Sequence, residues 1–347
     1  FVEERNLLPL EERGRTVHPD RACDLPAPEP QTAGNNRYLQ IIGQMARRHR
    51  LLSVHWELTF RCNEKCTHCY LDVFAPNADV PGELNTAQCK QVLHQLADLG
   101  ALNITFSGGE AFVRRDFFEI AEYARKLRFA IRIFTNAIAV TPAVAERIAR
   151  LYPTGVEVSL YSADAATHDA ITRVSGSHAA TLRGIRELRA RKINVIIKMP
   201  LMHETVRGMS LTRALAESLG AQFHYDPTLT PKNTGDTVNL RHRITYEDLI
   251  WLFEGEIGPE NWIKPAILAP ETHRSCSIGM HSLVIDPYGD VFPCVQTRTG
   301  FGNVLDTPLR QIWENSPAFK DLMQLNYSFL PVCATCELNN ICSRCHG

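Results

Sequence analysis

The sequence lacks several features that would assign the protein to a class at once. Its 347 residues hold 37 Lys and Arg against 38 Asp and Glu, so the net charge is −1. Without an excess of positive charge we expect no nucleic-acid partner. No apolar run reaches the roughly 18–20 residues of a membrane span, and no charged start with an apolar stretch marks a signal peptide. These absences predict a cytoplasmic protein that contacts neither nucleic acid nor membrane.

Cysteine is the feature that the sequence does have. Eleven cysteines would suit a disulfide scaffold only in a short, loop-rich secreted chain, and this chain is neither. Cys23 and Cys89 stand apart, whereas the other nine are grouped, which favours metal ligation. The grouped cysteines are Cys62, Cys66, Cys69, Cys276, Cys294, Cys333, Cys336, Cys342 and Cys345.

Apolar periodicity predicts six strands that alternate with helices between residues 53 and 227. The strands are expected at 53–60, 103–108, 131–136, 155–161, 194–200 and 221–227. Serial β-α units predict an α/β fold in which a parallel sheet curves into a partial (β/α)6 barrel of the TIM type. Functional loops then lie at the carboxyl ends of the strands.

Three regions are expected along the chain. Residues 1–52 form an N-terminal arm with a short helix at 36–50, and residues 53–245 form the partial barrel. The apolar period breaks at 228–245, which predicts a linker. Residues 246–347 then form a small C-terminal cysteine-rich domain, in which HSLVIDPYGDVFPC predicts a hairpin.

The stretch CNEKCTHCY, residues 62–70, follows directly on the first expected strand. One loop with this spacing can place three thiolates, Cys62, Cys66 and Cys69, on three corners of a cubane cluster and leave the fourth iron open. The alternative is a zinc site with His68 as the fourth ligand. Residues adjacent in sequence rarely both reach one tetrahedral ion, so iron–sulfur is favoured.

This C-x3-C-x2-C motif after the first strand of a β-α barrel resembles the signature of radical S-adenosylmethionine enzymes. The resemblance implies a [4Fe-4S] cluster on Cys62, Cys66 and Cys69, with S-adenosylmethionine bound to the open iron. Many members carry an aromatic residue just before the third cysteine, where this chain has His68, followed after the cysteine by Tyr70. This departure touches the packing of the cluster and leaves the three thiolates intact.

The resemblance also implies cofactor contacts at later strand ends. In the segment GGE, Gly108 and Gly109 permit close backbone approach, and Glu110 or nearby carbonyls accept from the cofactor's ammonium group. Ser159 is the candidate for the ribose contact. Three further candidates are weaker. The alternative for Arg173 is a solvated salt bridge, and the alternative for Lys198 is a strand-end lysine whose amine reaches water. These weaker candidates are Arg173, Lys198 and Asn136.

The C-terminal cysteines resemble the layout of the SPASM domain, so that the resemblance spans about residues 53–347. It implies one or two auxiliary clusters of the [4Fe-4S] type, one on Cys276, Cys294 and Cys345 and one on Cys333, Cys336 and Cys342. The last pair is spaced by two residues rather than the usual three, and a further downstream cysteine does not occur within the 347 residues. The fourth ligands stay open between His346, a residue beyond Gly347, a solvent species and the substrate. The structural alternative is a zinc ribbon from the last four cysteines.

Together these resemblances imply a radical maturase that reductively cleaves S-adenosylmethionine to a 5′-deoxyadenosyl radical. The implied substrate is a ribosomally made peptide or protein that becomes crosslinked. The expected partners are a flavodoxin- or ferredoxin-type electron donor and a separate leader-binding protein, because residues 1–52 are too short for a winged-helix recognition domain.

Three alternatives to this function stay open. The first is a radical enzyme that acts on a small molecule or a tetrapyrrole side chain. The second is a peptide epimerase with Cys89 as hydrogen donor. The alternative role for Cys89 is that of a buried, inert cysteine, which is the usual case on a helix. The third is an iron–sulfur or zinc scaffold without catalysis.

Overall fold

A single curved sheet runs through the computed structural model, which describes residues 37–257, 276–324 and 326. Its strand order is β6-β5-β4-β3-β2-β1-β7-β8, and every neighbouring pair is parallel except β7 and β8. The strands are β1 (Ser53–Glu57), β2 (Asn103–Ser107), β3 (Ala130–Thr135), β4 (Gly155–Ser159), β5 (Val195–Pro200), β6 (Gln222–Asp226), β7 (Ser282–Ile285) and β8 (Val291–Phe292).

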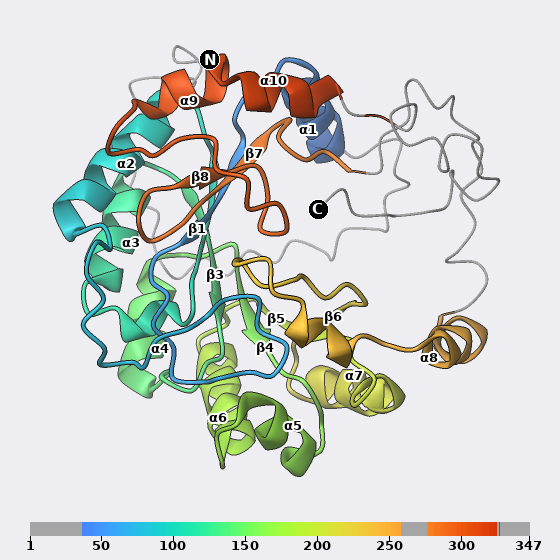
Figure 1. Cartoon of the computed structure of the whole chain (residues 1–347). Helices are drawn as coiled ribbons and strands as arrows, with labels where there is room; N and C mark the ends of the chain where they lie inside the picture. The colour runs from blue at the N-terminus through green and yellow to red at the C-terminus, as the bar shows by residue number, and fades with distance from the viewer. Residues whose placement is uncertain (1–36, 258–275, 325, 327–347) are drawn as a thin grey trace.

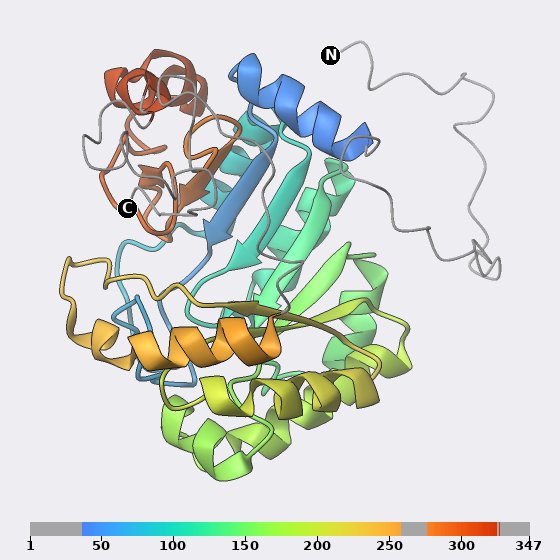
Figure 2. The same ribbon diagram turned by 90° about the vertical axis from the view of Figure 1, so that its right-hand side faces the viewer.

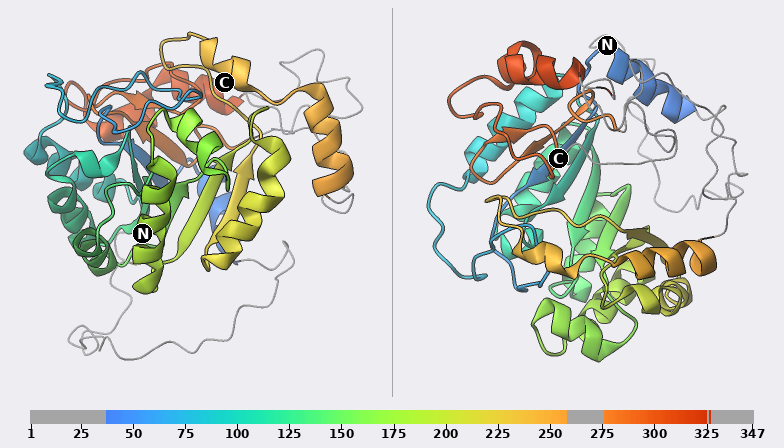
Figure 3. Two further views of the ribbon diagram at one scale, coloured as in Figure 1. Left: turned by 90° about the horizontal axis from the view of Figure 1, so that it is seen from below. Right: turned by 45° about the vertical axis from the view of Figure 1, so that its right-hand side comes forward.

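Helices cover the outer side of this sheet, so that the six strands β1–β6 form the predicted partial barrel (Figures 1 and 3). Some of the helices begin at side-chain caps, such as Asn85 before α2 and Thr141 before Pro142 of α4. The helices are α1 (Arg37–Arg47), α2 (Thr86–Asp98), α3 (Phe117–Lys126), α4 (Pro142–Arg150), α5 (Ala165–Thr172), α6 (Ser177–Ala190), α7 (Met209–Ser218), α8 (Tyr246–Trp251), α9 (Leu309–Asn315) and α10 (Pro317–Gln324).

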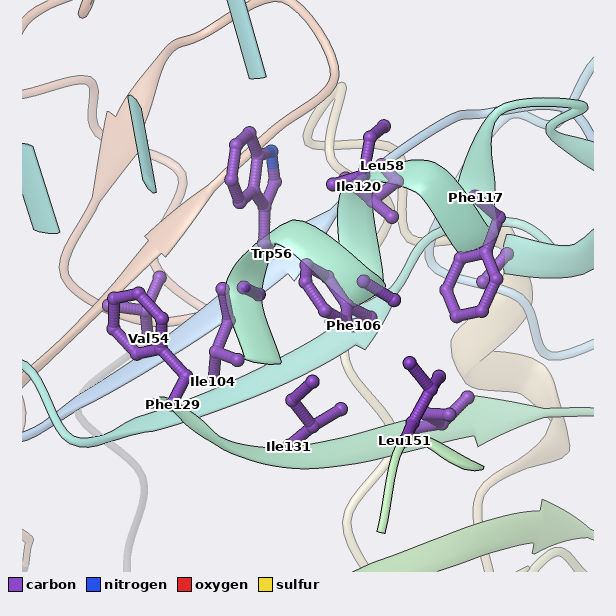
Figure 4. Packing of buried hydrophobic residues seen from close by; sticks show 14 of the residues in the cluster. Val54, Trp56, Leu58, Ile104, Phe106, Phe117, Ile120, Phe129, Ile131 and Leu151 are labelled. Atoms are coloured by element: carbon purple, nitrogen blue, oxygen red, sulfur yellow. The ribbon is translucent and has the colours of Figure 1, made fainter. Parts of the chain in front are cut away.

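Strand residues alternate between an apolar outer face and a polar inner face. Trp56, Ile104 and Phe106 lie on the outer face, are fully buried and pack with Phe117 and Ile120 of α3 (Figure 4). Each such side chain contributes about 1.5–3 kcal/mol on burial. Successive side chains of a strand point to opposite faces of the sheet. The residues next to the apolar outer positions therefore face the concave side, where the functional residues lie.

The predicted C-terminal hairpin is present as β7 and β8, but it does not form a sheet of its own. β7 pairs in parallel with β1, so the hairpin extends the barrel sheet. Helices α9 and α10 lie at this end of the molecule, away from α5 and α7 (Figure 2). His49 fastens them to the barrel, because its carbonyl accepts from Trp313 Nε1 at 3.1 Å and its ring stacks on that indole at 4.2 Å.

The stretch expected as a linker, residues 228–245, contains a 3-10 helix at Val238–His242. The side chain of Asn239 is buried and donates to the backbone carbonyls of His68 and Cys69. This stretch therefore packs against the cysteine loop rather than only joining two domains, and the domain boundary near residue 245 stays a prediction.

Two further expectations bear on the whole chain. Across the described residues, no helix combines the length and the apolar character that crossing a bilayer requires. Several predicted site residues lie outside the described ranges, as does Cys23, which belongs to neither group. These predicted residues are Cys333, Cys336, Cys342, Cys345 and His346.

Candidate functional site

The loop that carries Cys62, Cys66 and Cys69 leaves the carboxyl end of β1 and is fastened by backbone hydrogen bonds. The amides of Lys65 and Thr67 donate to carbonyls at the end of α5, at 3.1 and 2.9 Å, and the amide of Cys62 donates to the carbonyl of Phe74 at 2.9 Å. The loop is therefore held from both sides. Its conformation depends on α5, a helix that the sequence analysis did not predict.

Glu83 supports the start of the same loop. Its Oε1 accepts from the Thr59 hydroxyl at 2.6 Å and from the Phe60 amide at 3.1 Å, while Oε2 accepts from Arg61 at 2.9 Å. The carboxylate thus satisfies donors of three successive residues just before the first cysteine.

The three cysteines of the loop are free and partly buried. Burial raises the pKa of each thiol, to about 11 for Cys69 and well above its ordinary value for Cys66. Cys66 Sγ also lies 3.4 Å from the Tyr161 hydroxyl and 3.4 Å from Glu64 Oε2. Thiols buried in this way need a bound cation to become thiolates, which is the condition a metal cluster meets.

Gly108 and Gly109 lie directly against the base of the cysteine loop. The Gly109 amide donates to the Thr59 carbonyl at 2.7 Å, and Gly108 has a φ of +146°. A Cβ on either glycine would stand 2.4 Å from a backbone oxygen, that of Thr59 for Gly108 and that of Arg61 for Gly109. The two glycines are therefore required by the close approach of β2 to the loop as well as by any bound cofactor.

Glu110 is buried and makes protein contacts with both carboxylate oxygens. It accepts from the Thr135 hydroxyl at 2.9 Å, from the Asn136 amide at 2.8 Å and from the Phe112 amide at 3.1 Å. Burial raises the pKa of this carboxyl. Glu110 therefore ties the end of β3 to the end of β2, and its predicted contact with the cofactor's ammonium group stays a prediction.

A hollow of about 270 Å³ opens where β1, β2, β3 and β4 end. It brings together the three loop cysteines and four of the seven predicted cofactor residues. The predicted residues that line it are Cys62, Cys66, Cys69, Gly108, Gly109, Asn136 and Ser159.

The polar atoms around this hollow fit a bound polar group. His55 Nε2, Glu64 Oε1 and His68 Nδ1 are buried, and none has a hydrogen-bond partner within the described part of the chain. Burial lowers the pKa of His68 to about 4, so its ring is neutral. With three thiols and a glycine-lined wall beside them, this donor set fits a cubane cluster and a zwitterionic cofactor.

Three of the predicted residues lie elsewhere. Arg173 is exposed at the end of α5 and lines a second hollow on the loop, onto which Cys66 and Cys69 also open. Lys198 lies on the concave side of β5, with Nζ 3.5 Å from Glu157. Cys89 is fully buried on α2, where burial raises its pKa to about 11, and it lines neither hollow, as expected of an inert core cysteine.

A buried ion pair between distant segments was missed by the sequence analysis. The Glu57 carboxylate is fully buried at the end of β1 and receives two hydrogen bonds from Arg298, at 3.0 and 2.5 Å, and one from the Tyr70 hydroxyl at 2.6 Å. Cys294 lies four residues before Arg298. The only available signal was a charged residue inside an apolar strand.

Tyr161 and His168 form a second support that the sequence analysis did not identify. His168 is fully buried, and its Nδ1 accepts from the Tyr161 amide at 3.2 Å. The Tyr161 ring lines the cofactor hollow and also packs edge-on against His68. A neutral His168 therefore fixes the tyrosine that contacts Cys66.

Comparison with known proteins agrees with this site. The model of the Radical SAM superfamily matches residues 56–212, and that of the SPASM iron–sulfur cluster-binding domain matches residues 276–346. The mycofactocin maturase MftC of Mycobacterium ulcerans is 30% identical over 289 residues, which cover 78% of this chain and 76% of the relative. An AdoMet-dependent heme synthase of Methanosarcina barkeri is 29% identical over 321 residues, 85% of this chain and 90% of the relative.

A solved structure of similar fold is SuiB of Streptococcus suis bound to the precursor peptide SuiA. It superimposes with a TM-score of 0.64 at 16% identity and covers 93% of this chain and 80% of SuiB. At this identity the likeness concerns the fold.

Replacing Gly109 by alanine should deplete the first cluster while leaving the protein folded. The added Cβ would stand 2.4 Å from the Arg61 carbonyl and 3.0 Å from Cys62 Cβ, so the first cysteine must shift. We expect iron bound after anaerobic reconstitution to fall by about one cluster. Gly155→Ala is the matched control, because its Cβ meets nothing closer than 3.4 Å. Equal iron content in the two variants would contradict this account.

Stability should also fall in mild acid because of His168. Burial lowers the pKa of His168 from 6.5 to about 4, with a smaller contribution from nearby His178. The unfolded chain therefore takes up this proton first, and stability is lost as the pH falls from about 6.5 towards 4. The loss between pH 7.5 and pH 5 is about 2 kcal/mol.

His168→Asn removes this titration and keeps an acceptor for the Tyr161 amide. Urea unfolding of both proteins at pH 7.5 and pH 5 should show a smaller acid loss in the variant. An acid loss of the same size in both proteins would show that His168 does not contribute.

Proposed function

This chain belongs to the radical SAM superfamily and carries a SPASM iron–sulfur domain, and from that premise we propose that it modifies a ribosomally made peptide or protein, most directly by forming a crosslink. It is an enzyme that binds S-adenosylmethionine and a [4Fe-4S] cluster, and its C-terminal domain binds auxiliary iron–sulfur clusters. We assign the first cluster to Cys62, Cys66 and Cys69.

When bound, the cluster and S-adenosylmethionine supply a one-electron cleavage whose 5′-deoxyadenosyl radical takes a hydrogen atom from the substrate. The chain's own residues position these groups. Gly108 and Gly109 admit the cofactor to the loop, Asn136 and Ser159 orient it from the ends of β3 and β4, and Tyr161 packs beside Cys66.

The observation that carries the peptide proposal is the concave face of the sheet. In register across β1 to β6, the inward positions present hydrogen-bonding side chains and charges of both signs rather than an apolar wall. They are Ser53, His55, Glu57, Asn103, Thr105, Ser107, Ala130, Arg132, Phe134, Gly155, Glu157, Ser159, Ile196, Lys198, Pro200, Gln222, His224 and Asp226.

This face suits an extended polypeptide better than a flat macrocycle. Phe134 is the only phenyl or indole side chain in the set, whereas amide groups of a peptide can pair with the many polar positions. Arg132 and Lys198 share the buried Glu157 carboxylate, at 2.6 and 3.5 Å. The similarity to a mycofactocin maturase supports a peptide substrate, as does the presence of a precursor peptide in a structure of the same fold.

A second candidate is a tetrapyrrole substrate. It is favoured by the similarity to a heme synthase along 85% of this chain. In that case Arg132 and Lys198 would face substrate carboxylates instead of peptide groups.

The remaining partners are part of the same proposal. Reduction requires a flavodoxin- or ferredoxin-type donor, and a separate protein binds the leader of the substrate. We place the reaction in the cytoplasm, whose thiols stay reduced as the cluster cysteines require.

The test is anaerobic co-expression with each short peptide found in the reading frames that neighbour the gene, followed by mass spectrometry. We expect deoxyadenosine release and a peptide that has lost two hydrogen atoms in a new crosslink. An unchanged mass with an inverted residue would indicate epimerisation. Conversion of an added tetrapyrrole with no change in any peptide would overturn the proposal. The variant with Cys62, Cys66 and Cys69 replaced by alanine is the inactive control.

Lys198 is expected to contact the peptide rather than the cofactor, because it lies on β5 and does not line the cofactor hollow. Lys198→Gln should raise KM for the peptide about five- to tenfold, the loss of roughly 1 kcal/mol from an accessible charge. KM for S-adenosylmethionine should not change. Lys192→Gln, just before the amino end of the same strand, is the control. A selective rise in KM for S-adenosylmethionine would place Lys198 at the cofactor instead.

A further inference from the structure

A second hollow, of about 350 Å³, lies on the cysteine loop. Cys66, Cys69 and Val73 line both this hollow and the cofactor hollow, so the loop forms the wall between them. We call the second one the outer hollow. Its other lining residues that matter here are Lys65, Asp72, Arg173, Lys232, Val238 and Arg241.

Positive charge collects around the outer hollow from three separate segments. Lys65 comes from the cysteine loop, Arg173 from the end of α5, and Lys232 and Arg241 from the stretch after β6. Among the described residues, Asp72 is the only acidic one that lines it, and it is paired with Lys232. This surplus stands out in a chain whose net charge is −1.

Three of these cations have no anionic partner. Lys65, Arg173 and Arg241 are exposed, and none forms a salt bridge with any residue in the described ranges, although Arg241 Nε donates to the His242 ring at 3.3 Å. Exposed cations without an anionic partner raise the local potential and attract an anionic surface from a distance. Val73 and Val238 add an apolar centre between the charges, and Val238 is 48% exposed.

A molecule in the outer hollow is separated from the cofactor hollow by the loop itself. A substrate bound there could not bring an atom to the cofactor, because the cysteine loop stands in between. An electron can cross that wall, since the partly buried sulfur-bearing residues Cys66 and Cys69 belong to both sides. The geometry therefore suits delivery of electrons rather than delivery of substrate.

We propose that the outer hollow is the docking surface of an acidic, low-potential electron carrier, a flavin or iron–sulfur protein. This proposal rests on the proposed function, which requires such a donor. In each encounter the carrier is oxidised by one electron, and that electron passes through the Cys66 and Cys69 side of the loop to the first cluster. No bond forms or breaks at the contact. A small, charge-steered interface of this kind is typical of transient redox complexes.

The test reverses two rim charges in the reconstituted enzyme, Lys65→Glu together with Arg241→Glu. Arg173 is left unchanged because the family resemblance links it to the cofactor. The control carries two reversals on the outer helices, Lys126→Glu on α3 and Arg186→Glu on α6, where both side chains are exposed. A third protein, Lys65→Arg with Arg241→Lys, keeps the charge of the rim.

Two measurements are made with a purified bacterial flavodoxin. The first is its Kd for the enzyme, measured by biolayer interferometry at about 50 mM and about 200 mM salt. Exposed charges are screened weakly at the lower concentration and more strongly at the higher one. The second is the rate of deoxyadenosine formation with reduced flavodoxin and, separately, with dithionite. We expect the rim reversal to weaken flavodoxin binding at least about tenfold and to slow only the flavodoxin-driven reaction, because charge-steered association depends on the rim.

The control and the charge-keeping protein should behave like the unmodified enzyme. The proposal is overturned if the rim-reversal protein binds flavodoxin as tightly as the unmodified enzyme does. It is also overturned if deoxyadenosine formation slows equally with flavodoxin and with dithionite. The same holds if the reversal weakens binding of the precursor peptide and not of flavodoxin. If no reductant yields deoxyadenosine from the unmodified enzyme, the proposed function fails, and the Kd comparison still decides the docking surface.

Discussion

The Glu57 carboxylate is the contact on which the arrangement of the functional parts depends. It is fully buried at the end of β1 and is satisfied by Arg298 from beyond the C-terminal hairpin and by Tyr70 from the end of the cysteine loop. A buried carboxylate without partners would be strongly destabilising, so these segments are held where they meet it. The barrel, the loop and the start of the C-terminal domain are thereby fixed to one another.

The cysteine loop acts as a wall with two chemically different sides. Its inner side faces a hollow with unpartnered buried atoms and a glycine lining, where a polar cofactor fits. Its outer side faces exposed cations and a small apolar centre. Because α5 and the 3-10 helix at Val238–His242 support the loop, both sides depend on elements outside the cysteine motif.

Much of the barrel was predictable, because each of its six strands has an apolar pattern that is complete within its own few residues. The structure confirms them within a few residues, and it places Asn136 and Ser159 in the hollow with the three cysteines. Helix α5 was missed because it is short and its start depends on the Asp164 side chain rather than on a clear apolar period. The extension of the barrel sheet by β7 was also missed, since strand pairing over such a separation leaves no local signal.

The sequence alone determined the local chemistry. The spacing of Cys62, Cys66 and Cys69 indicates an iron–sulfur site, because ligands on one loop need only the geometry of that loop. The family resemblance carried by this loop and by the glycine pair after β2 implies the S-adenosylmethionine cofactor. The tertiary structure alone decided that Glu57 pairs with Arg298 and that Lys65, Arg173 and Arg241 line one hollow. These groups come from separate segments, and their approach is set by how the sheet and helices pack rather than by any spacing along the chain.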